Sequence, residues 1–139
     1  MTKPTIDELE IMTPDQLRVL FHIEVKKASP DVQHIKDLIA VGCPIEDRYE
    51  YGWTALHLAA LGGYPDIAEV LLSNGADIEA RDKWNMSPLH WAAWAVWHIE
   101  MVKFLISKGA QVNARDIHGH TAWDIVNGEK RILCPELRP

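Results

Sequence analysis

The sequence has few cysteines and no long apolar run, and these absences exclude several classes of protein. Its 139 residues include two cysteines. Cys43 and Cys134 lie far apart, without C-x-x-C or Cys/His spacing, so we expect free thiols and neither a disulfide framework nor a zinc site. No stretch of ~18 apolar residues is present, and the N-terminus lacks the basic and then apolar order of a signal peptide. We therefore expect a cytoplasmic protein without a membrane partner.

The sequence is also poor in basic residues. Lys and Arg number 14 against 20 Asp and Glu, which gives a net charge of −6. Binding to nucleic-acid phosphates requires clustered Lys and Arg, so we expect no nucleic-acid partner. Hydrophobic residues make up 47% of the chain and charged residues 24%, which is the balance of an ordinary globular domain and excludes disorder throughout.

Common catalytic motifs are missing as well. The chain contains no G-x-S-x-G, no glycine-rich phosphate loop ending in lysine, and no H-E-x-x-H. We therefore expect no enzyme activity and no cofactor.

What the chain does contain is an internal repeat. The segment GWTALHLAA at 52–60 returns as NMSPLHWAA at 85–93, at an offset of 33 residues in every position. The segment VLLSNGADIEA at 70–80 returns as FLISKGAQVNA at 104–114, with one extra residue in between. A period near ~33 residues with a T-P-L-H-x-A core is typical of ankyrin repeats. On these residues the chain resembles the ankyrin-repeat family, over roughly 31–126.

The resemblance implies an all-α ankyrin-repeat solenoid, in which helix-turn-helix units stack side by side with hairpin-like loops between them. The first unit lacks the repeat core, and Lys26 and Lys27 fall where later units have paired alanines, as suits an N-terminal cap. The last unit is too short for a second helix. The expected division is a flexible leader at 1–12, a divergent capping repeat at 13–46, full repeats at 47–80 and 81–114, and a truncated C-terminal repeat with a tail at 115–139.

Local signals predict several element boundaries. Thr13, Pro14 and Gln16 supply an N-cap hydroxyl, a proline at the first helical position and a capping-box partner, so a helix should begin there. Gly75 supplies the positive φ that ends an outer helix. The extra residue of the third unit lies between the helices of that unit, where we expect a local bulge.

His57 and His90 occupy the histidine position of the repeat core. The family resemblance implies a structural role for them, in which the imidazole binds the backbone of the hairpin loop in a neighbouring unit. An alternative is a metal-binding or enzymatic site in the last units, although the spacing there fixes no third ligand. The candidate residues for that alternative are His98, His118 and His120. We interpret His118 and His120 instead as exposed histidines at a hairpin tip, and we expect no metal site.

Six tryptophans are many for a slim helical array, whose core is built of Leu, Ile, Val and Ala, so some indoles must lie on the surface. The resemblance indicates one concave face, formed by hairpin tips and the ends of inner helices. Trp, Tyr, Arg and Met are enriched at the centres of protein interfaces. The expected partner-binding residues are Arg48, Glu50, Tyr51, Trp53, Arg81, Lys83, Trp84, Met86, Trp94, Arg115, Ile117, His118 and His120.

We expect this face to bind a folded protein partner, so that the chain acts as an adaptor, inhibitor or tether. Trp84 and Trp94 should point into one groove and form a continuous aromatic and cationic patch with Tyr51, Arg81 and Met86. The alternative for Trp53 and Trp84 is that they only cover the hairpins of adjacent units. The remaining alternative function is self-association of an open C-terminal end, although we expect a monomer with at most weak self-association.

Overall fold

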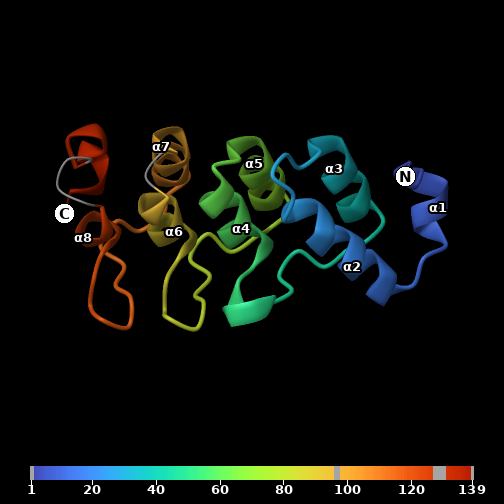
Figure 1. The fold of residues 1–139 in the computed structure, drawn as a ribbon, viewed down its shortest axis with the longest axis horizontal. Helices are drawn as coiled ribbons and strands as arrows, with labels where there is room; N and C mark the ends of the chain where they lie inside the picture. Colours follow the sequence, from blue (N-terminus) through green and yellow to red (C-terminus); the bar gives the residue numbers. More distant parts are fainter. Residues whose placement is uncertain (1, 96–97, 127–130, 139) are drawn as a thin grey trace.

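The computed structural model describes residues 2–95, 98–126 and 131–138, and its helices stack in one row (Figure 1). No strand occurs in these ranges, so the expected all-α solenoid is confirmed. The elements are α1 (Ile6–Glu10), α2 (Pro14–Val25), α3 (Val32–Ala40), η1 (Glu50–Gly52), α4 (Ala55–Gly62), α5 (Pro65–Ser73), α6 (Pro88–Trp94), α7 (Ile99–Ser107), α8 (Ala122–Ile125), η2 (Arg131–Leu133) and η3 (Pro135–Leu137). None of the described helices is both long and apolar enough to span a bilayer.

Two parallel series of helices form the body of the molecule. The inner helices α2, α4, α6 and α8 contact one another in that order, and the outer helices α3, α5 and α7 do the same. The loops project to one side of the inner helices (Figure 1). Ala59, Ala60, Ala92 and Ala93 are buried on the inner helices, because small side chains allow neighbouring helices to approach closely. The core is therefore continuous along the row.

The helices begin and end where the local signals predict. Thr13 caps α2 and forms a capping box with Gln16, and Pro14 is the first helical residue. Thr54 caps α4 in the same way. Gly75 follows the C-cap of α5 with a φ of 92°, a value that an L side chain rarely adopts.

Residues 2–12, which lie in the expected flexible leader, contain the short helix α1. Thr5 caps α1, its hydroxyl accepts from the Glu8 N–H, and the Glu8 carboxylate accepts from the Thr5 N–H. Leu9 is fully buried, and α1 packs against α3. The Lys3 ammonium adds an ion pair to Asp31, at 2.7 Å. A single buried leucine gives no periodicity, and for that reason α1 is not predicted from the sequence.

The first unit departs from the repeat in its inner helix. α2 ends at Val25, and Lys26 is its C-cap, so the lysines lie beyond the helix and are exposed. The Glu24 carboxylate is buried, and it accepts from the Asp31 N–H at 2.7 Å. The connector to α3 is thereby fixed by a polar contact where the second unit has Gly62 and Gly63.

The last unit ends as a half repeat in the described residues. α8 spans four residues, and η2 and η3 lie level with the outer helices of the other units (Figure 1). Cys134 and Leu137 are buried there, so short turns cover part of the C-terminal end that we expected to be open. The predicted bulge of the third unit falls on 96–97, outside the described residues. On either side of it, α6 ends at Trp94 and α7 begins at Ile99.

Candidate partner-binding surface

Three loops between the units close as hairpin turns and are joined to one another. Each turn is closed by a backbone N–H that donates to a carbonyl four residues later. These bonds run from Tyr49 to Trp53 (2.7 Å), from Asp82 to Met86 (3.1 Å) and from Asp116 to His120 (2.9 Å). Neighbouring tips are linked by the bonds Lys83 N–H to Tyr51 O (2.9 Å) and Ile117 N–H to Trp84 O (2.9 Å). The tips therefore form one continuous edge beside the inner helices.

One arginine braces each hairpin tip. The guanidinium donates to the carbonyl four residues later, and the residue at that position has a positive φ, which favours Gly or Asn. The pairs are Arg48 with Gly52 (3.0 Å), Arg81 with Asn85 (3.1 Å) and Arg115 with Gly119 (2.6 Å). The three arginines that we assigned to the partner surface thus already have a structural role, and their contact with a partner stays a prediction.

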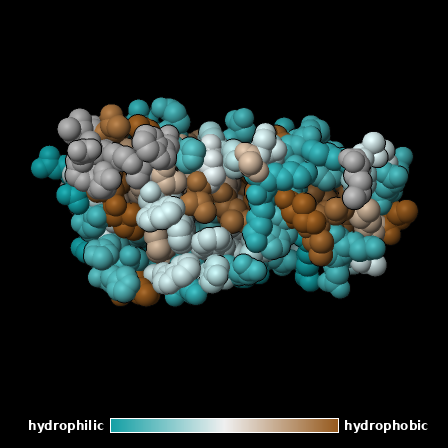
Figure 2. All heavy atoms as spheres, viewed as in Figure 1, coloured by the Kyte–Doolittle hydropathy of each residue, from teal (hydrophilic) through white to brown (hydrophobic). Residues whose placement is uncertain are grey.

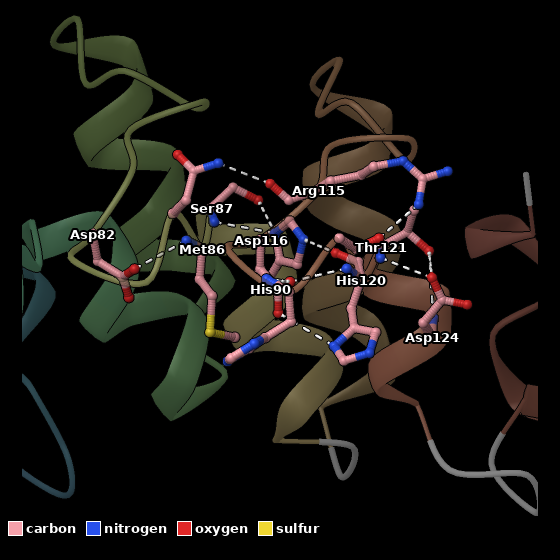
Figure 3. A network of polar contacts seen from close by, with 12 residues as sticks. Asp82, Met86, Ser87, His90, Arg115, Asp116, His120, Thr121 and Asp124 are labelled. Carbon is pink, nitrogen blue, oxygen red and sulfur yellow. Dashed lines mark hydrogen bonds and ion pairs between the residues drawn. The ribbon is translucent and has the colours of Figure 1, made fainter.

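His57 and His90 connect each inner helix to the next loop, as the family resemblance implies. The Thr54 N–H donates to His57 Nδ1 at 3.0 Å, so Nδ1 is the acceptor and Nε2 carries the proton. Nε2 then donates to Met86 O at 3.0 Å. His90 repeats this arrangement between Ser87 and the carbonyl of His120 (Figure 3). Burial lowers the pKa of both imidazoles, which favours this neutral form.

In the last unit Asp124 stands where the other units have histidine. Its carboxylate accepts from both the N–H and the hydroxyl of Thr121, each at 2.9 Å (Figure 3). These hydrogen bonds hold the pKa of Asp124 below its usual value. The carboxylate caps its own helix as the imidazole does, but it has no proton to donate to a further loop.

Five aromatic residues pack together on the second and third units, and we call them the aromatic cluster: Tyr51, Trp53, Trp84, Trp91 and Trp94. Four of the rings form a closed circuit. Its ring-centroid distances are 5.6 Å (Tyr51–Trp53), 5.0 Å (Trp53–Trp91), 6.0 Å (Trp91–Trp84) and 5.4 Å (Trp84–Tyr51). Trp94 extends the circuit from Trp91 at 5.9 Å. These separations are typical of favourable aromatic pairs.

The buried carboxylate of Asp82 holds the aromatic cluster in place. Oδ2 accepts from the indole N–H groups of Trp53 (3.1 Å) and Trp91 (2.7 Å). Oδ1 accepts from the backbone N–H groups of Trp84 and Met86, both at 2.9 Å. Four donors thus converge on one carboxylate. The cluster is therefore fixed before any partner arrives.

Part of the aromatic cluster faces solvent. Trp94 is 60% exposed and Tyr51 is 48% exposed, while Trp53, Trp84 and Trp91 are half-buried. The Lys83 ammonium lies 4.2 Å from the ring centroid of Tyr51 and 4.4 Å from that of Trp84, as in a cation–π contact. In Figure 2 atoms of neutral hydropathy gather over the middle of the molecule, where Figure 1 has α4, α6 and their loops.

The structure brings some of the predicted residues together and separates others. Tyr51, Trp53, Trp84 and Trp94 share the aromatic cluster with Lys83, but Trp84 reaches Trp94 only through Trp91. Glu50 and Met86 are in adjacent turns. The Met86 N–H donates to Asp82, and the Met86 carbonyl accepts from His57. Ile117, His118 and His120 are exposed on the last hairpin. The two histidine rings pair with each other, at 6.0 Å, and not with any ring of the aromatic cluster in the described chain.

The residues of the alternative metal site do not converge. Across the residues that the structure describes, no three His, Cys, Asp or Glu side chains form a group that could hold a metal. The ring of His98 packs against Gly63 of the preceding unit. A Cβ at position 63 would lie 2.2 Å from the nearest ring atom of His98. Asp116 uses its Oδ1 to bind the N–H groups of His118 and His120 (2.8 and 2.9 Å), which shapes the turn.

Trp91 and Asp82 are central to the aromatic cluster, but they are not among the residues predicted from the sequence. The available signal was Trp91 itself, since it replaces Leu58 of the preceding unit on an inner helix with little internal space. Nothing in the sequence pairs Asp82 with two indoles from different units. That link depends on the stacking of the units, which brings Trp53 and Trp91 to one carboxylate.

A second apolar surface lies at the N-terminal end of the row. Val19 and Ile23 are 57% and 55% exposed on α2, and Met12 and Leu20 lie beside Val19 in a shallow hollow. Figure 2 has a brown patch over this region. This surface is separate from the aromatic cluster, and it lies at the end opposite to the one where we expected self-association.

Comparisons with known proteins agree with the repeat. The family model described as "Ankyrin repeats (3 copies)" matches residues 21–116. Ankyrin repeat and SOCS box protein 6 of Pongo abelii is 44% identical over 78 residues, which cover 55% of this chain and 18% of that protein. Protein phosphatase 1 regulatory subunit 27 of Homo sapiens is 48% identical over 52 residues, or 37% of this chain and 34% of that protein. A putative ankyrin repeat protein of Rickettsia bellii is 37% identical over 67 residues, which are 48% of this chain and 28% of that protein.

These relatives are longer proteins, because the chain spans between 18% and 34% of their lengths. The family match begins within α2 and ends in the last hairpin loop, so it includes both full repeats and the whole aromatic cluster. It covers more than half of the chain, and the contact between an inner-helix histidine and the next loop occurs in both full repeats, His57 with Met86 and His90 with His120. The chain therefore belongs to the ankyrin-repeat family.

Proposed function

We propose that this chain is a non-catalytic module that binds a folded protein through its hairpin tips and inner helices. The observation that carries the proposal is the aromatic cluster, in which two large rings face solvent while a buried carboxylate fixes their neighbours. Ankyrin repeats are typically protein-interaction modules, and the name of one similar protein is that of a regulatory subunit.

Physical chemistry supports this use of the surface. Contiguous exposed apolar groups are unfavourable in water and commonly mark interaction sites. A fixed cluster also loses little side-chain entropy on binding, because the rings are already ordered. Tryptophan and tyrosine at such positions are frequent hot spots, whose truncation costs at least about 2 kcal/mol of binding free energy.

The experiment compares quantitative capture of protein partners by the intact chain and by Trp94→Ala and Trp84→Ala variants. Trp94 is mostly exposed, so its truncation should leave the melting temperature near that of the wild type and weaken binding at least about thirtyfold. Ile23→Ala is the matched control, since Ile23 is 55% exposed on the distant helix α2. Normal binding by the Trp94 variant would mean that the surface has been misplaced.

The same samples test the alternative of self-association. Sedimentation of the wild type, of Trp94→Ala and of Ile23→Ala over a range of concentrations separates three outcomes. A monomer at all concentrations supports a partner of another kind. A dimer lost in Trp94→Ala would assign the aromatic cluster to a second copy of the chain, and a dimer lost in Ile23→Ala would assign α2 to that role.

A further inference from the structure

The hydrogen-bonding capacity left on the aromatic cluster is unequal. Its buried acceptor, the carboxylate of Asp82, is already saturated by four N–H donors. The indole N–H groups of Trp84 and Trp94, by contrast, donate to no acceptor among the described residues, and Lys83 makes no ion pair there. The surface therefore offers donors and a cation together with exposed rings. A complementary ligand supplies acceptors, a carboxylate and apolar bulk.

Charge reinforces this selection. Arg48 lies on the tip beside that of Lys83, and its guanidinium donates to backbone carbonyls, whereas the guanidinium of Arg81 also pairs with the carboxylate of Glu79 at 3.4 Å. Asp82 lies beneath the rings and is buried. Glu50 is exposed in the same turn as Tyr51 and adds a negative charge to this surface. Among the described residues, the ammonium of Lys83 is the charged group that lies over the rings without an ion pair, and it is the group that selects a carboxylate.

The backbone conformation of the ligand follows from the donors. A helix keeps its interior carbonyls in its own hydrogen-bond ladder, so only its side chains and its last carbonyls could accept from the indole N–H groups. A proline-rich segment has unpaired carbonyls, lacks the N–H of each proline, and is recognised elsewhere in grooves lined by aromatic rings. The steps Tyr51–Trp84, Trp84–Trp91 and Trp91–Trp94 are 5.4, 6.0 and 5.9 Å between centroids. Each step corresponds to about two residues of such a segment, at ~3.1 Å per residue.

We propose that the aromatic cluster binds an extended, proline-rich segment of the partner protein that carries an acidic residue. The prolines stack on the rings of Tyr51, Trp84 and Trp94, the indole N–H groups donate to the segment's carbonyls, and the carboxylate pairs with Lys83. This inference rests on the proposed function and adds the chemistry of the partner to it.

The test uses synthetic dye-labelled peptides of about eight residues, long enough to follow the cluster, and fluorescence anisotropy with the intact chain. One peptide has proline at most positions and a central Asp. A second replaces each proline by Ala, and a third replaces the Asp by Lys. We expect the alanine peptide to bind at least about fivefold more weakly, because it is not preorganised. The lysine peptide should bind about three- to tenfold more weakly.

A charge swap makes the test specific to Lys83. Lys83→Glu should reverse the preference, so that the lysine peptide binds more tightly than the Asp peptide. Lys103→Glu, a charge reversal on the outer helix α7, should leave the original order unchanged. Equal binding of the proline and alanine peptides, or an unchanged preference in Lys83→Glu, would overturn the inference. If no peptide binds while capture of a protein still depends on Trp94, the proline-rich ligand is wrong and the proposed function stands.

Discussion

An Asp82→Asn substitution would place an amide where four N–H donors meet two carboxylate oxygens. The amide has one acceptor oxygen, so its NH₂ group must face either the indoles of Trp53 and Trp91 or the N–H groups of Trp84 and Met86. Two buried donors then lose their acceptor and meet another donor. Each such loss costs about 1–3 kcal/mol, and the two share one site, so we expect a total of about 2–4 kcal/mol in the free energy of unfolding.

Asp116→Asn is the matched control, because Asp116 occupies the same position in the next hairpin. Its Oδ1 accepts from His118 N–H and His120 N–H, while its Oδ2 lies 3.6 Å from Nδ1 of His120. The amide of Asn can keep its oxygen on the backbone donors, so the expected cost is about 1 kcal/mol, from the loss of the charged acceptor.

The assay for both substitutions is urea unfolding followed by far-UV circular dichroism, which does not depend on the altered tryptophans. Near-UV dichroism of the folded proteins adds a second readout. The tryptophan signal should change in Asp82→Asn and persist in Asp116→Asn. Equal losses of stability in the two variants, with an unchanged tryptophan signal, would refute the inference that Asp82 organises the aromatic cluster.

Three further predictions concern the rest of the array. Burial lowers the pKa of His57 and His90, so their neutral forms stabilise the fold fully above pH ~6.5, the pKa of histidine in the unfolded chain. This stabilisation is lost as the pH falls below that value, and a melting temperature that stays constant from pH ~8 to ~5.5 would contradict the prediction. Leu9→Ala should cost about 2–4 kcal/mol in urea unfolding, against about 0.5 kcal/mol or less for Ile11→Ala, and equal costs would mean that α1 is not docked. Ala93→Leu should cost about 1–3 kcal/mol through overpacking, and a cost as small as that of Ile11→Ala would refute the proposed register.

The sequence was sufficient to predict the features that recur with the period. Thr54 and His57 return as Ser87 and His90, and the structure gives both pairs the same cap and the same contact with the next loop. Gly75 follows its helix with a positive φ, and this feature is predictable because it depends only on local sequence. The repeat period and the local capping signals were therefore enough to predict the solenoid.

Features that occur once were harder to predict. α1 is held by the single leucine Leu9 and a short capping box, which is too little pattern to separate it from a leader. The surface residues Trp84 and Trp94 were predicted, but the ring that connects them, Trp91, was not. The link through Asp82 exists only after two units have stacked, so no spacing within one unit could indicate it.

Asp124 replaces the histidine of the earlier units, and this makes the last unit different from those before it. An imidazole accepts a hydrogen bond with one nitrogen and donates one with the other, so His57 and His90 each cap their own helix and also bind the loop of the next unit. A carboxylate only accepts hydrogen bonds, so at Asp124 this series of contacts between a helix and the next loop ends. An engineer who grafts a further repeat after this unit would therefore have to restore histidine at position 124, since a new loop would otherwise lack its donor.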